Sequence, residues 1–122
     1  MALEINPTLD IDYLAQVYGD DATIIHLIFD AFLSDSLPRW IALKSSIQSR
    51  NLDEAASIVH GLKPSFTMAG ITWLRPQVED FERAIKAQAT NAELQGFYTK
   101  ISKELDILKP ILETESVRLS AM

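Results

Sequence analysis

The chain has 122 residues, of which 48% are hydrophobic and 23% charged, as in an ordinary globular protein, so we expect a single domain over residues 1–122. The absence of cysteine excludes disulfides and thiolate chemistry. The net charge of −6 argues against nucleic-acid binding, which needs a basic surface. Neither a signal sequence nor an apolar run approaching about 20 residues is recognisable, so we expect no membrane insertion and a cytoplasmic location.

The first half of the chain contains the patterns of three helices. A short first helix is predicted after Thr8 or Asp10, either of which can cap it, and a glycine–aspartate turn follows. A second helix is predicted over residues 22–36 and a third over residues 38–49, separated at Pro38 because a proline disfavours helix in the residue before it. The apolar stripes of these helices are Leu9, Tyr13, Leu14 and Val17, then Ile25, Ile28, Phe29 and Phe32, then Trp40, Ile41, Leu43 and Ile47.

The second half contains the patterns of three more helices. The fourth is predicted to begin after a cap at Asn51 and to end at Gly70, the fifth to begin near Thr72, and the sixth to begin after a cap at Asn91 and to kink or end at Pro110. Their stripes are Leu52, Ala55, Val59, Leu62 and Phe66, then Leu74, Val78, Phe81 and Ile85, then Leu94, Phe97, Tyr98, Ile101, Leu105, Leu108 and Leu112. Short connections between amphipathic helices favour antiparallel neighbours. The predicted fold is therefore all-α, an antiparallel up-down four-helix bundle with a short additional N-terminal helix.

The two histidines, His26 and His60, have different helical surroundings. At about 100° per residue, His60 lies at the edge of the buried stripe centred on Val59. Its helical neighbours are small or polar: Ala56, Ser57, Lys63, Pro64 and Thr67. The imidazole of His60 is therefore expected to face solvent. Residue type alone favours a surface histidine without a function, and His26 is expected to be an ordinary exposed helical residue opposite the apolar stripe of its helix.

Several other chemistries lack the residues that they need. A di-metal site in a helical bundle uses Glu-x-x-His pairs, whereas Thr23 and Ser57 stand three residues before the two histidines. Two histidines without cysteine leave few ligands for zinc. Ser57 and Ser65 have no recognisable base and acid beside them, and no glycine-rich phosphate loop is present. No metal or cofactor site is therefore expected in this chain.

Residues 60–70, HGLKPSFTMAG, resemble the phosphoacceptor motif of histidine-containing phosphotransfer (HPt) domains, His-x-Leu-Lys-Gly-Ser-Ser followed by a Leu-Gly-type helix end. The residues in register with the family pattern are His60, Leu62, Lys63, Ser65, Gly70, Leu74, Val78, Phe81 and Glu82. The resemblance spans about residues 9–115. Two positions depart from the pattern, since Pro64 replaces the family's glycine and Phe66 replaces a small residue. A kink one turn after His60 is expected, with an effect on the choice of partner.

The resemblance implies a phosphocarrier without kinase activity of its own. His60 would accept a phosphoryl group from a receiver-domain aspartate and pass it to another receiver. Response-regulator receiver domains and a hybrid sensor histidine kinase would be the partners, and the receiver would supply Mg²⁺. Lys63 would stabilise the phosphoryl group, and Glu82 and Lys86 would lie near the level of His60 on the next helix. The receiver is expected to cover Ala56, Ser57, His60, Lys63, Pro64 and Thr67, with Lys86 at the rim.

Two other functions stay open at this point. The chain could be a helical docking or adaptor bundle without phosphotransfer activity, which the intact pair of His60 and Lys63 argues against and Pro64 mildly favours. It could also be an oligomeric structural bundle, which would need a second apolar stripe on an outer helix. The sequence contains no clear stripe of that kind, so we expect a monomer.

Overall fold

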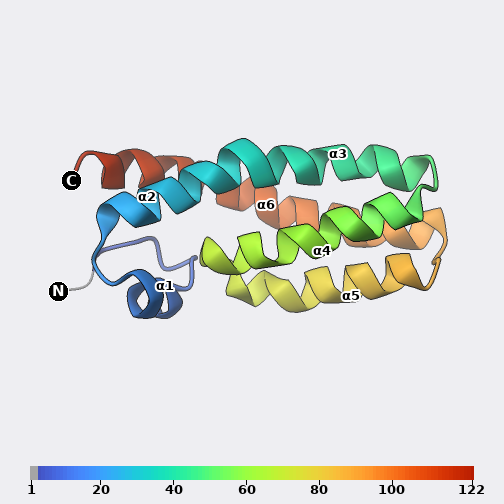
Figure 1. Cartoon of the computed structure of the whole chain (residues 1–122), viewed down its shortest axis with the longest axis horizontal. Helices are drawn as coiled ribbons and strands as arrows, with labels where there is room; N and C mark the ends of the chain where they lie inside the picture. The colour runs from blue at the N-terminus through green and yellow to red at the C-terminus, as the bar shows by residue number, and fades with distance from the viewer. Residues whose placement is uncertain (1–2) are drawn as a thin grey trace.

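The computed structural model describes residues 3–122, and within them the regular secondary structure is entirely helical, which confirms the predicted all-α class. The helices are α1 (Ile11–Tyr18), α2 (Ala22–Ala31), α3 (Leu37–Gln48), α4 (Leu52–Met68), α5 (Arg75–Lys86) and α6 (Asn91–Ser120). Figure 1 shows the rod of α2 and α3 lying lengthwise beside α4, α5 and α6, with α1 at one end. None of the described helices combines the length and the apolarity that crossing a bilayer requires.

Two helix starts follow the predicted capping residues. Of the two candidates for α1, Asp10 is the cap, because its carboxylate accepts a hydrogen bond of 3.0 Å from the backbone N–H of Tyr13. Asn51 caps α4 as predicted and accepts a hydrogen bond of 3.3 Å from the backbone N–H of Glu54. Each cap satisfies one of the N–H groups that the first turn of a helix leaves without a partner.

The last helix departs from the prediction at its start and at its proline. Thr90 caps α6 instead of Asn91, because its hydroxyl accepts from the N–H of Glu93 while the Glu93 side chain accepts from the N–H of Thr90. This capping box satisfies two N–H groups at once. The helix also continues through Pro110 to Ser120. Apolar side chains are buried before and after the proline, and this burial offsets the one lost hydrogen bond.

Helices α2 and α3 form one continuous helical rod, so the predicted boundary at Pro38 is wrong. Between them, residues Phe32–Ser36 form a π-helical turn, in which the N–H of Leu37 donates to the carbonyl of Phe32. Proline has no N–H, and in an α-helix its ring crowds the carbonyl four residues earlier. The wider turn accommodates this demand without ending the helix.

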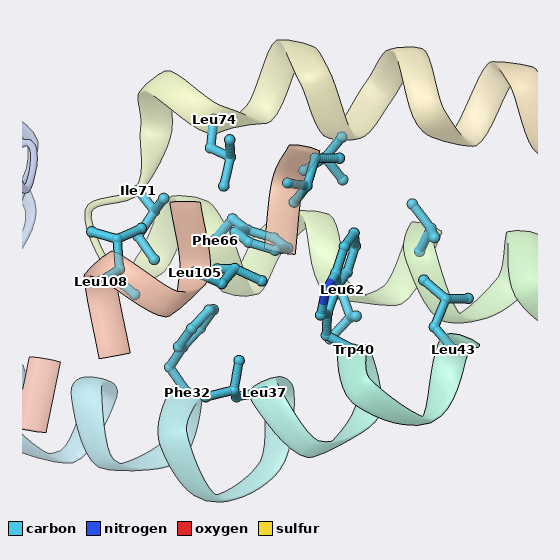
Figure 2. Packing of buried hydrophobic residues seen from close by; sticks show 14 of the residues in the cluster. Phe32, Leu37, Trp40, Leu43, Leu62, Phe66, Ile71, Leu74, Leu105 and Leu108 are labelled. Carbon is cyan, nitrogen blue, oxygen red and sulfur yellow. The ribbon is translucent and has the colours of Figure 1, made fainter. Parts of the chain in front are cut away.

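Most of the predicted stripe residues are buried in one hydrophobic cluster. Its aromatic centre joins Trp40 of α3 to Phe66 of α4, with Phe32 on the other side of Phe66 (Figure 2). The ring centroids lie 6.2 Å and 5.5 Å apart in edge-to-face geometry, an arrangement that aromatic pairs favour. Two residues that were predicted on the apolar stripes are instead exposed, Val17 by 53% and Ile41 by 62%. Ile41 follows Trp40 directly, so its side chain points about 100° away from the stripe.

The turn after α4 positions the next helix beside it. Gly70 ends α4 as predicted, with a φ of +79° that favours glycine. A 3₁₀ turn over Thr72–Leu74 follows, so α5 begins at Arg75 rather than near Thr72, with Pro76 in its first turn. Helices α4 and α5 then lie side by side (Figure 1). Residues about ten positions before and after the turn therefore come to the same level.

Candidate functional site

His60 lies on the exposed ridge of α4, as the sequence predicts. The His60 side chain is 70% exposed, whereas Val59 and Leu62 on the packed side of the helix are fully buried. Ser57, Gly61 and Pro64 on the same ridge are also exposed. The helix is therefore held by its buried face, and the imidazole can meet another molecule without any rearrangement of the core.

A buried carboxylate on α5 lies directly behind the imidazole. The side chain of Glu82 is only 7% exposed, and its Oε2 atom lies 2.9 Å from Nδ1 of His60. Its Oε1 atom lies 2.7 Å from Nζ of Lys63, and Oε2 also lies 3.4 Å from Nζ of Lys86. The structure therefore brings together His60, Lys63 and Lys86 around Glu82, from two helices whose relative level the sequence predicts.

The contact with Glu82 distinguishes the two ring nitrogens of His60. A carboxylate accepts hydrogen bonds and does not donate them, so Nδ1 of a neutral imidazole carries the proton and donates a hydrogen bond to Glu82. The other nitrogen, Nε2, then has a free lone pair. Because the side chain is 70% exposed, this lone pair is available to an incoming electrophile. Nε2 is therefore the ring nitrogen that a neutral His60 leaves open to another molecule.

The surroundings of Glu82 keep its carboxylate ionised. Burial alone would raise the pKa of Glu82, but hydrogen bonds from Lys63 and His60, the charge of Lys63 and a hydrogen bond from Lys86 together lower that pKa below its ordinary value. A carboxylate whose pKa is lowered by folding stabilises the folded protein at neutral pH.

We expect the contribution of Glu82 to stability to disappear in acid. It is fully present above the pKa of Glu82 in the unfolded chain, near 4.5, and is lost as the pH falls through the lower pKa of the folded state. Urea unfolding of wild type and Glu82→Gln at pH 7, 5, 4 and 3 measures this directly, since the difference in unfolding free energy between the two proteins should shrink below pH 4.5. A difference in unfolding free energy that is the same at all four pH values would show that the Glu82 carboxylate does not stabilise the folded protein in this way.

Lys63 has a partner within the protein that its position in the sequence did not predict. Its side chain is 16% exposed, and its ammonium group is already paired with Oε1 of Glu82. Lys86 is held less closely, because its side chain is 61% exposed and its Nζ lies 3.4 Å from Oε2 of Glu82. The predicted role of Lys63 in stabilising a phosphoryl group stays a prediction, and Lys86 is the more accessible of the two cations.

The remaining residues of the predicted docking surface lie along the same side of α4. Ser57 and Pro64 are exposed, whereas Ala56 and Thr67 are half-buried. The hydroxyl oxygen of Thr67 accepts a hydrogen bond of 2.7 Å from the guanidinium of Arg75. Thr67 is therefore already engaged within the protein, and Ser57 and Pro64 are the more open parts of the surface around His60.

The opposite flank of the ridge has a cation that the sequence analysis missed. A Cβ atom added to Gly61 would lie 3.1 Å from an Nη atom of Arg39, so the Arg39 guanidinium from α3 lies against the residue next to His60. Arg39 and Gly61 are 22 residues apart in the sequence, and no local pattern links them. The contact follows from the packing of α3 on α4.

His26 differs from the prediction of an ordinary exposed residue. It is half-buried, and its Nδ1 lies 2.9 Å from the carbonyl oxygen and 2.8 Å from the hydroxyl oxygen of Ser116 on α6. The Ser116 hydroxyl also lies 3.2 Å from a carboxylate oxygen of Asp30, to which it donates. The sequence could not reveal this contact, because it joins residues 90 positions apart. His26 therefore links α2 to the last helix.

No group of three or more histidine and acidic side chains in residues 3–122 is arranged to hold a metal ion. Comparison with protein-family models, with curated proteins and with solved structures finds no match to this chain.

Proposed function

We propose that this chain is a histidine phosphotransfer domain that accepts a phosphoryl group from a receiver-domain aspartate on Nε2 of His60 and passes it to another receiver. The observation that carries the proposal is the pairing of an exposed imidazole with a buried carboxylate. Nδ1 of His60 is held 2.9 Å from Glu82, and the side chain remains 70% exposed. A histidine oriented in this way presents one defined nitrogen to a partner.

The transfer step replaces the P–O bond of an aspartyl phosphate with a P–N bond to His60. The Nε2 lone pair attacks the phosphorus of an aspartyl phosphate, a P–N bond forms, the P–O bond to the aspartate breaks, and the aspartate leaves as a carboxylate. The proton on Nδ1 stays in place, so the ring of His60 becomes positively charged as the new bond forms. Glu82 lies next to that charge and stabilises it. Because the transition state is loose, positioning and charge stabilisation supply most of the catalysis, and the receiver brings the Mg²⁺ ion.

The proposal includes the architecture and the partners that the HPt resemblance implies. The α2–α3 rod, α4, α5 and α6 are taken as the four members of an antiparallel up-down bundle, and α1 is the additional helix. The protein acts as a monomeric phosphocarrier in the cytoplasm and has no kinase activity of its own. Its partners are response-regulator receivers and a hybrid sensor kinase. The rigid bundle supports this role, because transfer needs a fixed imidazole and an open surface.

Phosphoryl transfer from labelled receivers tests the proposal. The protein is mixed with receiver domains of the same organism that carry ³²P-phosphoaspartate, and the label on this chain is then treated with acid or with alkali. We expect transferred label that is lost in acid and retained in alkali, as for a phosphohistidine. Binding of a receiver without any transfer of label would instead support a docking or adaptor bundle.

A further inference from the structure

On the Glu82 side, the proposed phosphohistidine has little positive charge beside it other than that of its own ring. A phosphoryl group adds a charge of about −2 at neutral pH to a chain whose net charge is already −6. Lys63 and Lys86 carry two positive charges, but both face the negative charge of Glu82, and Lys63 is mostly buried against it. Apart from the charge of the phosphorylated ring itself, only about one positive charge is therefore left on this side of His60.

Arg39 lies on the α3 side of the ridge, against the residue that follows His60. Its Nη atom lies 3.1 Å from the position of a Cβ on Gly61, so it is no farther than about 4.6 Å from the Gly61 Cα. The Cα of His60 is about 3.8 Å farther along the chain. An arginine side chain with four rotatable bonds can cover the remaining distance by changing rotamer. Glycine at position 61 leaves the space that the guanidinium occupies.

The present partner of Arg39 holds it only weakly. Its nearest carboxylate is Asp35 at 3.7 Å, and the two side chains are 44% and 70% exposed. An exposed ion pair between residues four positions apart on a helix contributes little stability and is screened by salt. The guanidinium can therefore leave Asp35 for a stronger acceptor at little cost. A phosphoryl group is such an acceptor, because its oxygens match the fork of N–H donors on arginine.

We propose that Arg39 binds the phosphoryl group on His60 from the α3 side, so that phosphohistidine is held between Arg39 and Lys86. This inference rests on the proposed function, since it describes the phosphorylated state of the same residue. It assigns the principal phosphoryl contact to Arg39, which the sequence analysis did not consider, whereas Lys63 remains with Glu82. Gly61 takes part by leaving room for the guanidinium.

Chemical phosphorylation tests the inference without a receiver. Phosphoramidate is used to phosphorylate wild type, Arg39→Gln, Gly61→Ala and the control Lys44→Gln, and ³¹P NMR follows the phosphoryl group of His60 from pH 5 to 9 at low salt. Lys44 is an exposed cation on the same helix, but it lines the groove between α3 and α6 with Tyr98. The control therefore removes the same charge from a different face.

The expected result is a change specific to Arg39. A nearby cation favours the dianionic phosphoryl group, so Arg39→Gln should raise its pKa by about 0.3, the size expected for one screened surface cation, and Lys44→Gln should leave it unchanged. In wild type the Nε–H signal of Arg39 should move on phosphorylation. In Gly61→Ala this movement should be smaller, and the pKa of the phosphoryl group should lie between the values of wild type and Arg39→Gln.

Superimposable titrations of wild type and Arg39→Gln, or equal changes in Arg39→Gln and Lys44→Gln, would overturn the inference. Failure of phosphoramidate to modify His60 would overturn it too, because the imidazole would then not be open on this face. If phosphoramidate modifies His60 but receivers transfer no label, that result would count against the proposed function. The Arg39 inference would then still be decided by the ³¹P titrations.

Discussion

Replacement of His60 by glutamine is expected to abolish phosphoryl transfer from a receiver. Glutamine has no nucleophilic nitrogen, so acceptance of label should fall by on the order of 10³-fold or more, as when the nucleophile of other covalent mechanisms is removed. Stability should change by less than about 1 kcal/mol, because the side chain is 70% exposed and glutamine can still donate to Glu82. Transfer of ³²P label and urea unfolding measure the two effects.

His26→Gln is the matched control for this experiment. His26 is the only other histidine, and it is half-buried against Ser116. Its replacement should leave transfer within about twofold of wild type, although the lost hydrogen bond should lower stability by about 1 kcal/mol. Label retained in His60→Gln, or lost only in His26→Gln, would show that the phosphoacceptor has been assigned to the wrong residue.

Replacement of Glu82 by glutamine is expected to reduce both stability and transfer. The carboxylate is 7% exposed and faces Lys63, His60 and Lys86, so its neutral replacement leaves the mostly buried Lys63 without a counter-charge. Loss of one partner of a fully buried ion pair costs about 3–5 kcal/mol, and the exposure of Lys86 and His60 reduces the expected cost to about 2 kcal/mol. Transfer should slow by about tenfold, because the positive charge on the ring loses its partner.

Glu79→Gln is the control that shows whether the loss of any acidic side chain on α5 reduces stability and transfer in the same way. Glu79 is paired with Arg75 at 3.1 Å, and both side chains are more than one third exposed. Its replacement should cost less than about 1 kcal/mol and should leave the transfer rate unchanged. Equal losses of transfer in the two variants would mean that the contact between Glu82 and Nδ1 has no particular role in the reaction.

The buried faces of the helices were predictable from the sequence because their spacing is regular. The stripe through Ala55, Val59, Leu62 and Phe66 is fully buried in the structure, and it places His60 on the exposed side without further information. Capping was predictable where one residue has the right chemistry, as at Asn51. The prediction of the cap of α6 was wrong, because Thr90 and Asn91 stand next to each other and both residue types are good caps.

The burial of Glu82 was predictable from the spacing of the apolar residues on its helix. Glu82 stands four residues after Val78 and three before Ile85, which places it on the buried stripe of α5 rather than opposite to it. A carboxylate in that position needs cations or donors from a neighbouring helix. His60 and Lys63 were already predicted to lie at the same level, so the cluster could have been anticipated.

Other features depend on packing that no local pattern contains. The π-helical turn before Pro38 is one of several ways to accommodate a proline, and the sequence predicted a break instead. The contact of Arg39 with Gly61 depends on how α3 lies against α4. The contact of His26 with Ser116 likewise joins α2 to the far end of α6.

Localisation of the phosphoryl group to a single nitrogen tests the central claim most directly. The chain is labelled with ¹⁵N-histidine and phosphorylated by a receiver, and long-range ¹H–¹⁵N NMR then identifies the modified ring nitrogen. The account predicts a phosphoryl group on Nε2 of His60, with the proton retained on Nδ1 next to Glu82. A phosphoryl group on Nδ1 of His60, on His26 or on no histidine would contradict it.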